Sequence, residues 1–524
     1  MKKSIRSWVC SLILPALIVG CGSPSPAATP TPTVSPVITT EGQTSGKNKV
    51  QFTEETCKFN NMPPNGMIQC GIIVVPEDRT NPEGKKIKLH VAIVKSSAAN
   101  KKTDPVLLLG GTNAILQYAG FIANGFSGIL SQRDVVIMDQ RGVGYSEPNL
   151  DCPELTDLFF SSFDLAPYAK LMVDKSHDAM VNCHDRLVKA GSNLAGYTSQ
   201  ASAADFEDLR QALGYPQWNI YGIGYGARLA QILMQSNPQT VRSVIMDSPV
   251  PAGTSIFSGE AVYAGQTLDW LFQSCAADDK YHEAFPDLKK VFYDDIAQLN
   301  QSPVEVKVHD LQNGKDYTVT VDGMRLIEQT LGVLSQDAPN TLPLLPRMIY
   351  QVNSGKFDDQ LANTLSTIAY NEPTSIGLQM VIYCREDALT PTQLSQSNSG
   401  ADPALVAYFN KVDALNADAC RVWTPIHAAA ERAATGSISS SIPTLIEQGN
   451  LSYNTPSAWG KQIAKGMVIA YYVEFSGAGA PVSFLQNWST CPSTINAAFL
   501  DKPTVHPDTT CASAKVTPEW VTFN

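Results

Sequence analysis

The chain is poor in the patterns that mark metal, phosphate and nucleic-acid sites. Its 524 residues include only seven histidines, and charged residues make up 17%. No H-E-x-x-H motif, spaced Cys/His zinc pattern or G-x-x-x-x-G-K-[ST] loop occurs. The formal net charge is −11, and no basic stripe with interleaved aromatic residues is present, so the surface repels phosphate backbones. We therefore expect no metal, no cofactor and no nucleic-acid partner.

Long apolar runs are also scarce, apart from one at the N-terminus. Three basic residues within the first six positions precede an apolar run over 8–19, which is too short to span a bilayer comfortably. The run ends in Ile18-Val19-Gly20-Cys21, which resembles a bacterial lipobox. The resemblance implies that residues 1–20 are a signal peptide and that the sulfur of Cys21 carries diacylglycerol. An ordinary secretory leader is the alternative.

Residues 21–50 are rich in proline, serine, threonine and alanine, with little to bury. Such a segment stays extended or disordered and acts as a tether. Because two or more acyl chains anchor a protein stably, we expect a lipid anchor on the bacterial cell membrane, with the bilayer as partner and the folded body outside the cytoplasm.

Eleven cysteines favour an exported protein that contains disulfides. Cys10 leaves with the leader and Cys21 takes the lipid, which leaves nine. Proximity in the sequence suggests four pairs, although the sequence alone leaves the connectivity open: Cys57–Cys70, Cys152–Cys183, Cys384–Cys420 and Cys491–Cys511. Cys275 is then left over as a free or buried thiol.

The pattern over 51–250 alternates buried strands with amphipathic helices, which indicates a mostly parallel sheet covered on both faces. Strands are expected at 106–109, 135–138, 219–221 and 243–246. Helices are expected at 202–213 and 225–236. For the first helix we predict a capping box made by Ser202 and Asp205, and an end at Gly214.

The alternation stops over 251–430, where helical patterns such as 264–274 and 357–370 dominate. One hairpin is expected at 304–308 and 317–321, around Asn313-Gly314. We interpret this region as a cap inserted into the sheet domain. Strand patterns return at 444–446 and 471–473, so 431–524 is expected to complete the sheet.

The strand-to-helix turn 219–228 is built like a nucleophile elbow. In the G-x-S-x-G form of this turn, a sharp bend presents a serine oxygen for attack. Here the turn is Gly222-Ile223-Gly224-Tyr225-Gly226, with glycine in place of the serine. No G-x-S-x-G occurs anywhere in the chain.

Three stretches resemble the tripeptidyl-aminopeptidase and prolyl-aminopeptidase branch of the α/β-hydrolases, in exported forms with a TAP-like C-terminal segment. They are Asp-Gln-Arg-Gly-Val-Gly-Tyr-Ser at 139–146, the region 209–251 around the elbow, and Gln-Gly-Asn-Leu-Ser-Tyr-Asn-Thr-Pro at 448–456. The resemblance runs from about Cys57 to Cys511. It implies an α/β-hydrolase fold with a mainly helical cap.

The same resemblance places the triad positions of the family on residues without triad chemistry. The serine falls on Gly224, the aspartate on Ser452 and the histidine on Ala480. The Gly-Gly-Pro-Gly loop of the family reads Gly-Gly-Thr-Asn at 110–113, so Gly111, Thr112 and Tyr225 are the positions equivalent to the oxyanion hole. These changes predict a non-catalytic protein whose remaining pocket binds a peptide, a small molecule or a partner protein. The sequence leaves the oligomeric state unknown.

Two alternatives remain open at this point. The protein could be an active hydrolase that uses other residues, for example His506 reaching back from the C-terminal tail. The segment Gly222–Ala227 also fits the G-x-G-x-x-A dinucleotide pattern, with Asp247 near the expected distance for a ribose contact. The residues that flank the turn match hydrolases better.

Overall fold

The computed structural model describes residues 50–59, 67–112, 116, 119, 122, 126–310, 315–336, 341–354, 375–423, 436–484, 490–514 and 518–523. The chain divides into two units, Met1–Asn48 and Lys49–Asn524. The expected signal peptide, the tether and Cys21 lie outside the described residues. Among the described helices, none has both the length and the apolar character that a bilayer span requires.

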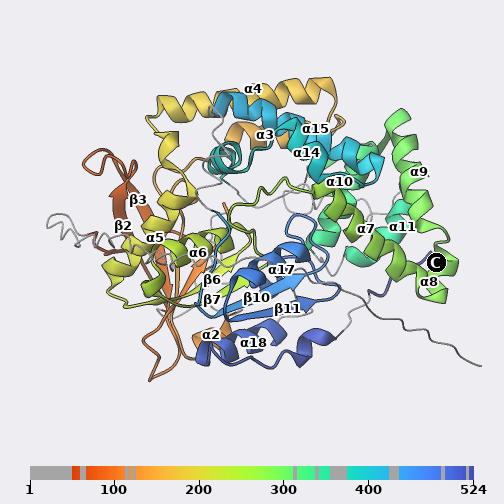
Figure 1. The fold of residues 1–524 in the computed structure, drawn as a ribbon. Helices are drawn as coiled ribbons and strands as arrows, with labels where there is room; N and C mark the ends of the chain where they lie inside the picture. Colours follow the sequence, from red (N-terminus) through yellow and green to blue (C-terminus); the bar gives the residue numbers. More distant parts are fainter. Residues whose placement is uncertain are drawn as a thin grey trace, which may run out of the picture. The chain divides into compact units, whose positions relative to one another are not determined.

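A nine-stranded sheet forms the centre of the second unit (Figure 1). Its order is β1 (Thr53–Glu55), β2 (Ile68–Pro76), β3 (Lys86–Val94), β5 (Val135–Met138), β4 (Val106–Leu109), β6 (Trp218–Ile223), β7 (Val241–Asp247), β10 (Thr444–Gly449) and β11 (Ala470–Phe475). The pairs from β1 to β5 are antiparallel, and all pairs from β5 to β11 are parallel. The expected mostly parallel sheet is therefore confirmed.

Helices cover both faces of this sheet, so its central strands are buried on both sides. Alternate residues of a strand point to opposite faces. Accordingly, Ile220 packs with α5 (Ser199–Leu213), α6 (Tyr225–Ser236) and α17 (Ser457–Gly466). Tyr221, its neighbour in the chain, packs with α2 (Ser127–Leu130) and α18 (Thr490–Asp501) on the other face.

The predicted start of α5 was wrong by one helical turn. The N-cap is Thr198, whose side chain accepts a hydrogen bond from the Ala201 amide. Ser202 lies inside the helix and is buried. Both Thr198 and Ser202 are capping residue types, and the sequence offered no signal to choose between them. The predicted end is confirmed: Gly214 adopts the left-handed conformation with φ +74°.

The cap region contains α7 (Glu260–Ala276), α8 (Asp279–Ala284), α9 (Leu288–Gln301), α10 (Gly323–Gln336), α11 (Leu345–Gln351), α13 (Ile376–Ile382), α14 (Pro391–Ser397) and α15 (Pro403–Trp423). It has a hydrophobic core of its own. The expected hairpin is confirmed as β8 (Val304–Asp310) and β9 (Lys315–Val321). Its Asn313-Gly314 turn and the expected helix at 357–370 lie outside the described residues.

Two helices from an earlier part of the chain join this cap. They are α3 (Pro153–Ser161) and α4 (Lys170–Lys189), which lie between β5 and α5 in the sequence. Cys183 and Leu187 of α4 share a buried cluster with Leu378 and Trp423 of the cap. Figure 1 shows α3 and α4 beside α15. Part of the region expected to form only the sheet domain therefore lies with the cap.

All four expected disulfides are present, with Cα–Cα distances of 5.1 to 5.8 Å: Cys57–Cys70, Cys152–Cys183, Cys384–Cys420 and Cys491–Cys511. Cys275 is free and buried in α7, as expected. Burial raises the pKa of this thiol to about 11, so it is not a reactive thiolate at neutral pH.

Candidate functional site

The backbone of the elbow has the bend that a nucleophile would require. Gly224 lies between the end of β6 and the start of α6, with φ +55° and ψ −115°. L-residues avoid this region of backbone conformation, whereas glycine enters it without steric cost. A Cβ atom built on Gly224 would meet no atom within 4 Å. The position normally filled by a nucleophilic side chain is therefore open space.

The two flanking glycines of the elbow are required by close packing. A Cβ on Gly222 would lie 2.7 Å from the Cα of Ala227, and one on Gly226 would lie 2.1 Å from the carbonyl oxygen of Leu109. Strand β6, helix α6 and strand β4 therefore approach each other through these glycines. The turn keeps its compact geometry although it presents no nucleophile.

Strand direction brings Gly224, Ser452 and Ala480 to one edge of the sheet. They follow β6, β10 and β11, which belong to the parallel part of the sheet. The Leu451 amide donates to the Ala478 carbonyl at 2.9 Å, so the loops of Ser452 and Ala480 are in contact. The assignment of these positions as triad equivalents stays a prediction.

Asp247, at the end of β7, connects the elbow to the loop after Ala480. Its carbonyl accepts from the Gly224 amide at 3.0 Å. Its carboxylate accepts from the Val482 amide and from the amide and hydroxyl of Ser483, at 2.9, 2.9 and 2.6 Å. Burial raises the pKa of Asp247, against the effect of these hydrogen bonds.

The buried carboxylate of Asp247 argues against the dinucleotide alternative. Asp247 is fully buried, and donors from the chain itself occupy both carboxylate oxygens. A ribose contact needs an accessible carboxylate. The position that the pattern singled out is thus used to join two loops of the site.

The hydroxyl of Ser452 is engaged within its own loop. It donates to Asn454 Oδ1 at 2.7 Å or shares a hydrogen bond with Thr455 Oγ1 at 2.7 Å, and it accepts from the Thr455 amide at 3.3 Å. Ser452 is buried and carries no charge. It therefore stabilises a turn and cannot orient an imidazole as a carboxylate does.

Ala480 is held by the cap. Its amide donates to the carbonyl of Ser335, in α10, at 2.7 Å. Its methyl group can neither accept nor donate a proton. The inserted cap thus contacts the third predicted triad position directly.

The loop expected to form the oxyanion hole is fixed through its carbonyls. Gln140 Nε2 donates to Gly111 O at 2.6 Å and to Gly110 O at 3.2 Å, and the Thr112 carbonyl accepts from the Ser375 amide at 2.9 Å. The amide of Tyr225 is the first in α6 and has no acceptor within the helix. A carbonyl or carboxylate could bind at this amide.

A buried polar network ties the start of α6 to the cap, which sequence reasoning missed. Ser199 Oγ lies 2.6 Å from the Tyr225 hydroxyl, and the Ser199 amide donates to Glu386 at 2.8 Å. Arg228 forms a bidentate ion pair with Asp387 at 3.0 and 2.9 Å. Burial raises the pKa of Glu386, against the opposing effect of Arg228. The only sign of this network in the sequence is Arg228, in the first turn of α6 after the elbow.

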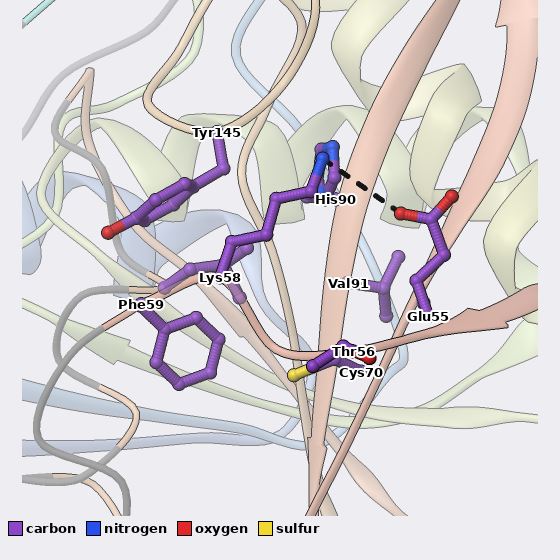
Figure 2. Close-up of a pocket in the computed structure, with 10 residues that line it drawn as sticks. Glu55, Thr56, Lys58, Phe59, Cys70, His90, Val91 and Tyr145 are labelled. Carbon is purple, nitrogen blue, oxygen red and sulfur yellow. Dashed lines mark ion pairs between the residues drawn. The ribbon is translucent and has the colours of Figure 1, made fainter.

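His90 lies in a different part of the sheet, three strand spacings from β6, which is about 14 Å. It lines a cavity of about 10 Å³, roughly the size of one water molecule. Figure 2 shows the His90 ring beside the end of Lys58, which forms an ion pair with Glu55 at 4.0 Å. Burial and, next, Lys58 lower the pKa of His90.

The other histidines also lie on other elements. His506 packs on Tyr471, near the start of β11, with ring centroids 4.9 Å apart. Because Ala480 follows the opposite end of β11, the idea that His506 reaches back into the site is wrong. The remaining described histidines belong to α4, α8 and β8: His177, His184, His282 and His309. His427 lies outside the described residues.

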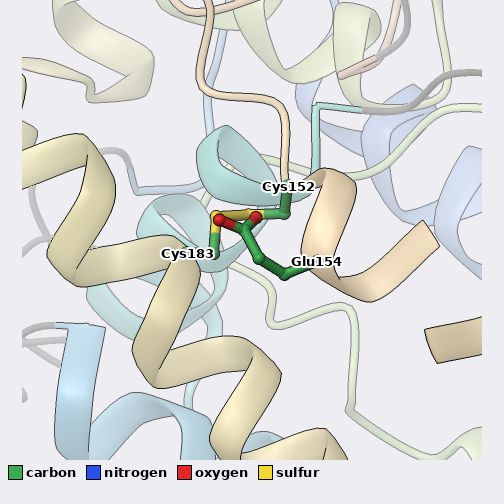
Figure 3. A group of neighbouring side chains, drawn as sticks. All are labelled: Cys152, Glu154 and Cys183. Carbon is green, nitrogen blue, oxygen red and sulfur yellow. A yellow bond between two sulfur atoms is a disulfide. The ribbon is translucent and has the colours of Figure 1, made fainter. Parts of the chain in front are cut away.

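One group of side chains has the spacing of a metal site among the described residues. It consists of Cys152, Glu154 and Cys183. Figure 3 shows that the two sulfur atoms are bonded to each other. Glu154 is paired with Arg186 at 2.6 Å. Disulfide sulfurs are not thiolate ligands, so this group is not suited to bind a metal.

The strand order, the elbow after β6 and the inserted cap define an α/β-hydrolase fold. A family model described as alpha/beta hydrolase fold matches residues 104–303. Solved structures aligned to the chain include an alpha/beta hydrolase fold protein from Chitinophaga pinensis, at 11% identity and TM-score 0.32, covering 79% of this chain and 94% of that one. A proline iminopeptidase from Mycobacterium smegmatis aligns at 14% identity and TM-score 0.34, covering 83% and 98%.

Curated relatives are peptidases and hydrolases at low identity. A tripeptidyl aminopeptidase of Streptomyces lividans is 27% identical over 233 residues, covering 41% of this chain and 42% of that protein. The serine protease Hip1 of Mycobacterium tuberculosis is 25% identical over 227 residues, covering 41% and 42%. The chain therefore matches less than half the length of these two relatives. The putative hydrolase YuaR of Escherichia coli is 22% identical and covers 68% and 71%.

Proposed function

We propose that this protein binds a peptide outside the cytoplasm without cleaving it. The observation that carries the proposal is the bend at Gly224, which opens onto free space and offers no nucleophile. Hydrolysis by this route needs a nucleophile, a histidine and a carboxylate. Gly224, Ser452 and Ala480 supply none of them.

We place the binding site between the elbow and the cap, where the packing does not depend on the side chains at 224, 452 and 480. The elbow is held by the close packing of Gly222 and Gly226. The cap is held to the elbow helix by the ion pair of Arg228 with Asp387. The amide of Tyr225 offers a donor for a peptide carbonyl.

A peptide with a free amino terminus fits the charges next to Ser452. Glu260 of α7 and Glu328 of α10 both act electrostatically on Tyr453, the residue after Ser452. Glu260 is half-buried and the Glu328 side chain is exposed. Desolvation by the surrounding protein raises the pKa of both carboxyl groups. A positively charged amino terminus bound beside them would favour their ionised forms and be held by them. The likeness to a tripeptidyl aminopeptidase agrees with this choice of ligand.

The test of lost catalysis is covalent labelling with a fluorophosphonate probe, together with assays on aminoacyl-arylamide substrates. We expect neither labelling nor turnover. The variant Gly224→Ser with Ser452→Asp and Ala480→His should gain both. Gly224→Ser alone is the matched control, because it supplies the oxygen without a base. Labelling of the unmodified protein would refute the proposal and support an active hydrolase.

The test of peptide binding is fluorescence anisotropy with a labelled tripeptide. We expect a tripeptide with a free amino terminus to bind at least tenfold more tightly than its N-acetylated form. Glu328→Gln should reduce that preference, whereas replacement of the exposed Glu83 by Gln should leave it unchanged. Equal binding of both peptides would reject an amino-terminal contact, and binding of neither would favour a small molecule or a protein partner.

We also propose that the protein is attached to the membrane through lipid on Cys21. The proposal rests on the sequence Ile18-Val19-Gly20-Cys21 and the tether that follows. Cys21→Ser should move the protein from the membrane fraction to the soluble fraction and abolish metabolic labelling with palmitate. If the unmodified protein stays in the membrane fraction but is not labelled with palmitate, an uncleaved leader anchors it instead.

A further inference from the structure

The end of the chain crosses from the sheet domain to the cap. After β11, α18 and a short 3-10 helix at Thr510–Ser513 stay with the sheet domain, where Cys491 of α18 is bonded to Cys511. His506 packs on Tyr471 of β11 in the same region. Up to residue 513 the tail therefore belongs to the sheet domain.

Residues 518–523 lie instead against cap helices. Trp520 is only 2% exposed and contacts Trp270 of α7 edge to face, with centroids 6.3 Å apart. The Val521 amide donates to the Pro343 carbonyl at 2.9 Å. Phe523 contacts Phe285 at 5.4 Å. Figure 1 shows the C-terminus beside α8 and α11.

The cap helices that receive this tail also touch the site. Helix α10 packs against α7 and α9 and, through the Ser335 carbonyl, accepts the hydrogen bond from Ala480. Tyr453, beside Ser452, packs against the hydrophobic cluster that contains Ala264 and Leu268 of α7. Movement of α7 would therefore change the wall of the predicted binding pocket.

The contact is well packed, but two of its features limit its stability. The Trp520 indole N–H is buried without an acceptor among the described residues. A buried donor without an acceptor lowers the net stability of the contact. Phe523 is 43% exposed. These features suit a contact that can open without unfolding the domain.

We propose that residues 518–523 form a strap that ties the cap helices α7, α9 and α11 to the sheet domain. The strap is covalently connected to the sheet domain and inserts Trp520 into the hydrophobic core of the cap. Its release would free one side of the cap. This proposal rests on the proposed function in one respect only, which is that the cap would cover a bound peptide.

Hydrogen–deuterium exchange on the purified protein tests the strap. Trp520→Ala and a chain ending at Ser513 should each raise exchange in α7, α9 and α11 at least tenfold. Exchange in β6 and α6 should stay unchanged. Val505→Ala is the matched control, because Val505 lies earlier in the tail and is 55% exposed. Unchanged exchange in α7, α9 and α11 would overturn the proposal.

A milder variant distinguishes a local effect of the strap from general unfolding of the protein. Val521→Pro removes the amide that donates to Pro343 and leaves Trp520 in place. It should raise exchange in the same helices by a smaller factor. A uniform rise across the whole chain in all variants would mean that the tail supports global stability, and the strap would be refuted. Peptide affinity is not used, so this outcome is independent of the proposed function.

Discussion

Replacing Gly224 by alanine tests directly whether the elbow keeps the bend of a nucleophile turn. The added methyl group would meet no atom within 4 Å, so no clash contributes to the result. What remains is the cost of placing a side chain at φ +55° and ψ −115°, which is about 1–3 kcal/mol. We therefore expect Gly224→Ala to lower the free energy of unfolding by this amount.

The size of the expected shift in melting temperature follows from the size of the folded unit. With about 2.1 cal/mol/K of unfolding entropy per residue, a unit of roughly 470 residues loses about 1 °C per kcal/mol. Scanning calorimetry should therefore show a decrease of about 1–3 °C. Gly226→Ala, the comparison variant, should be more damaging because its methyl group would overlap the Leu109 carbonyl.

The sign of the change in melting temperature distinguishes a bent turn at Gly224 from an ordinary backbone conformation. At an ordinary backbone angle, glycine to alanine stabilises a protein by about 0.4–1 kcal/mol, because it restricts the unfolded chain. A rise in melting temperature for Gly224→Ala would therefore refute the bent elbow. It would also remove the main support for the proposed function, because an unbent turn would not place residue 224 at the mouth of the site.

Two further predictions concern buried charges in the cap. Asp387→Ala should lower the free energy of unfolding by about 3 kcal/mol, because buried Arg228 would lose its bidentate partner and keep only Glu386 at 3.8 Å and the Thr254 carbonyl. In urea denaturation, the exposed Asp174→Ala should change it by less than about 1 kcal/mol. Burial raises the pKa of Asp413 to about 7. The folded state therefore keeps a proton that the unfolded state loses above about pH 4, so stability should fall as the pH rises from 4 to 7 and then level off. Asp413→Asn should show a smaller fall in melting temperature over this range, and an identical fall in both proteins would contradict the assignment.

Much of the sheet could be predicted from the sequence because its signals are local. Short apolar runs ended by glycine or charged residues predicted β4 and β5 with the observed bounds. The four disulfides followed from proximity in the sequence because each joins cysteines 13 to 36 residues apart. Such short loops cost little entropy to close, so neighbouring cysteines are favoured partners.

Features that depend on distant contacts could not be predicted in the same way. The periodicity of α4 indicates a helix but not that it packs against α15, more than 200 residues later. The ion pair between Arg228 and Asp387 joins residues 159 positions apart. The aromatic residues at 520 and 523 suggested no contact with the cap, because an apolar residue near a chain end carries no information about its partner.

If the protein is non-catalytic as proposed, the Arg228 network explains how the elbow could keep its shape without catalytic residues. In a serine hydrolase the nucleophile is bent into place by the elbow, and the elbow must be held from both sides. Here one side is held by the glycine contacts with β4 and Ala227. The other is held by Ser199 of α5, which contacts Tyr225, and by the cap through the Arg228–Asp387 pair. None of these contacts uses the side chains at 224, 452 or 480. Glycine also adopts the bend without strain, so under the proposed function the exchange of a serine for Gly224 would leave this frame at least as stable as before.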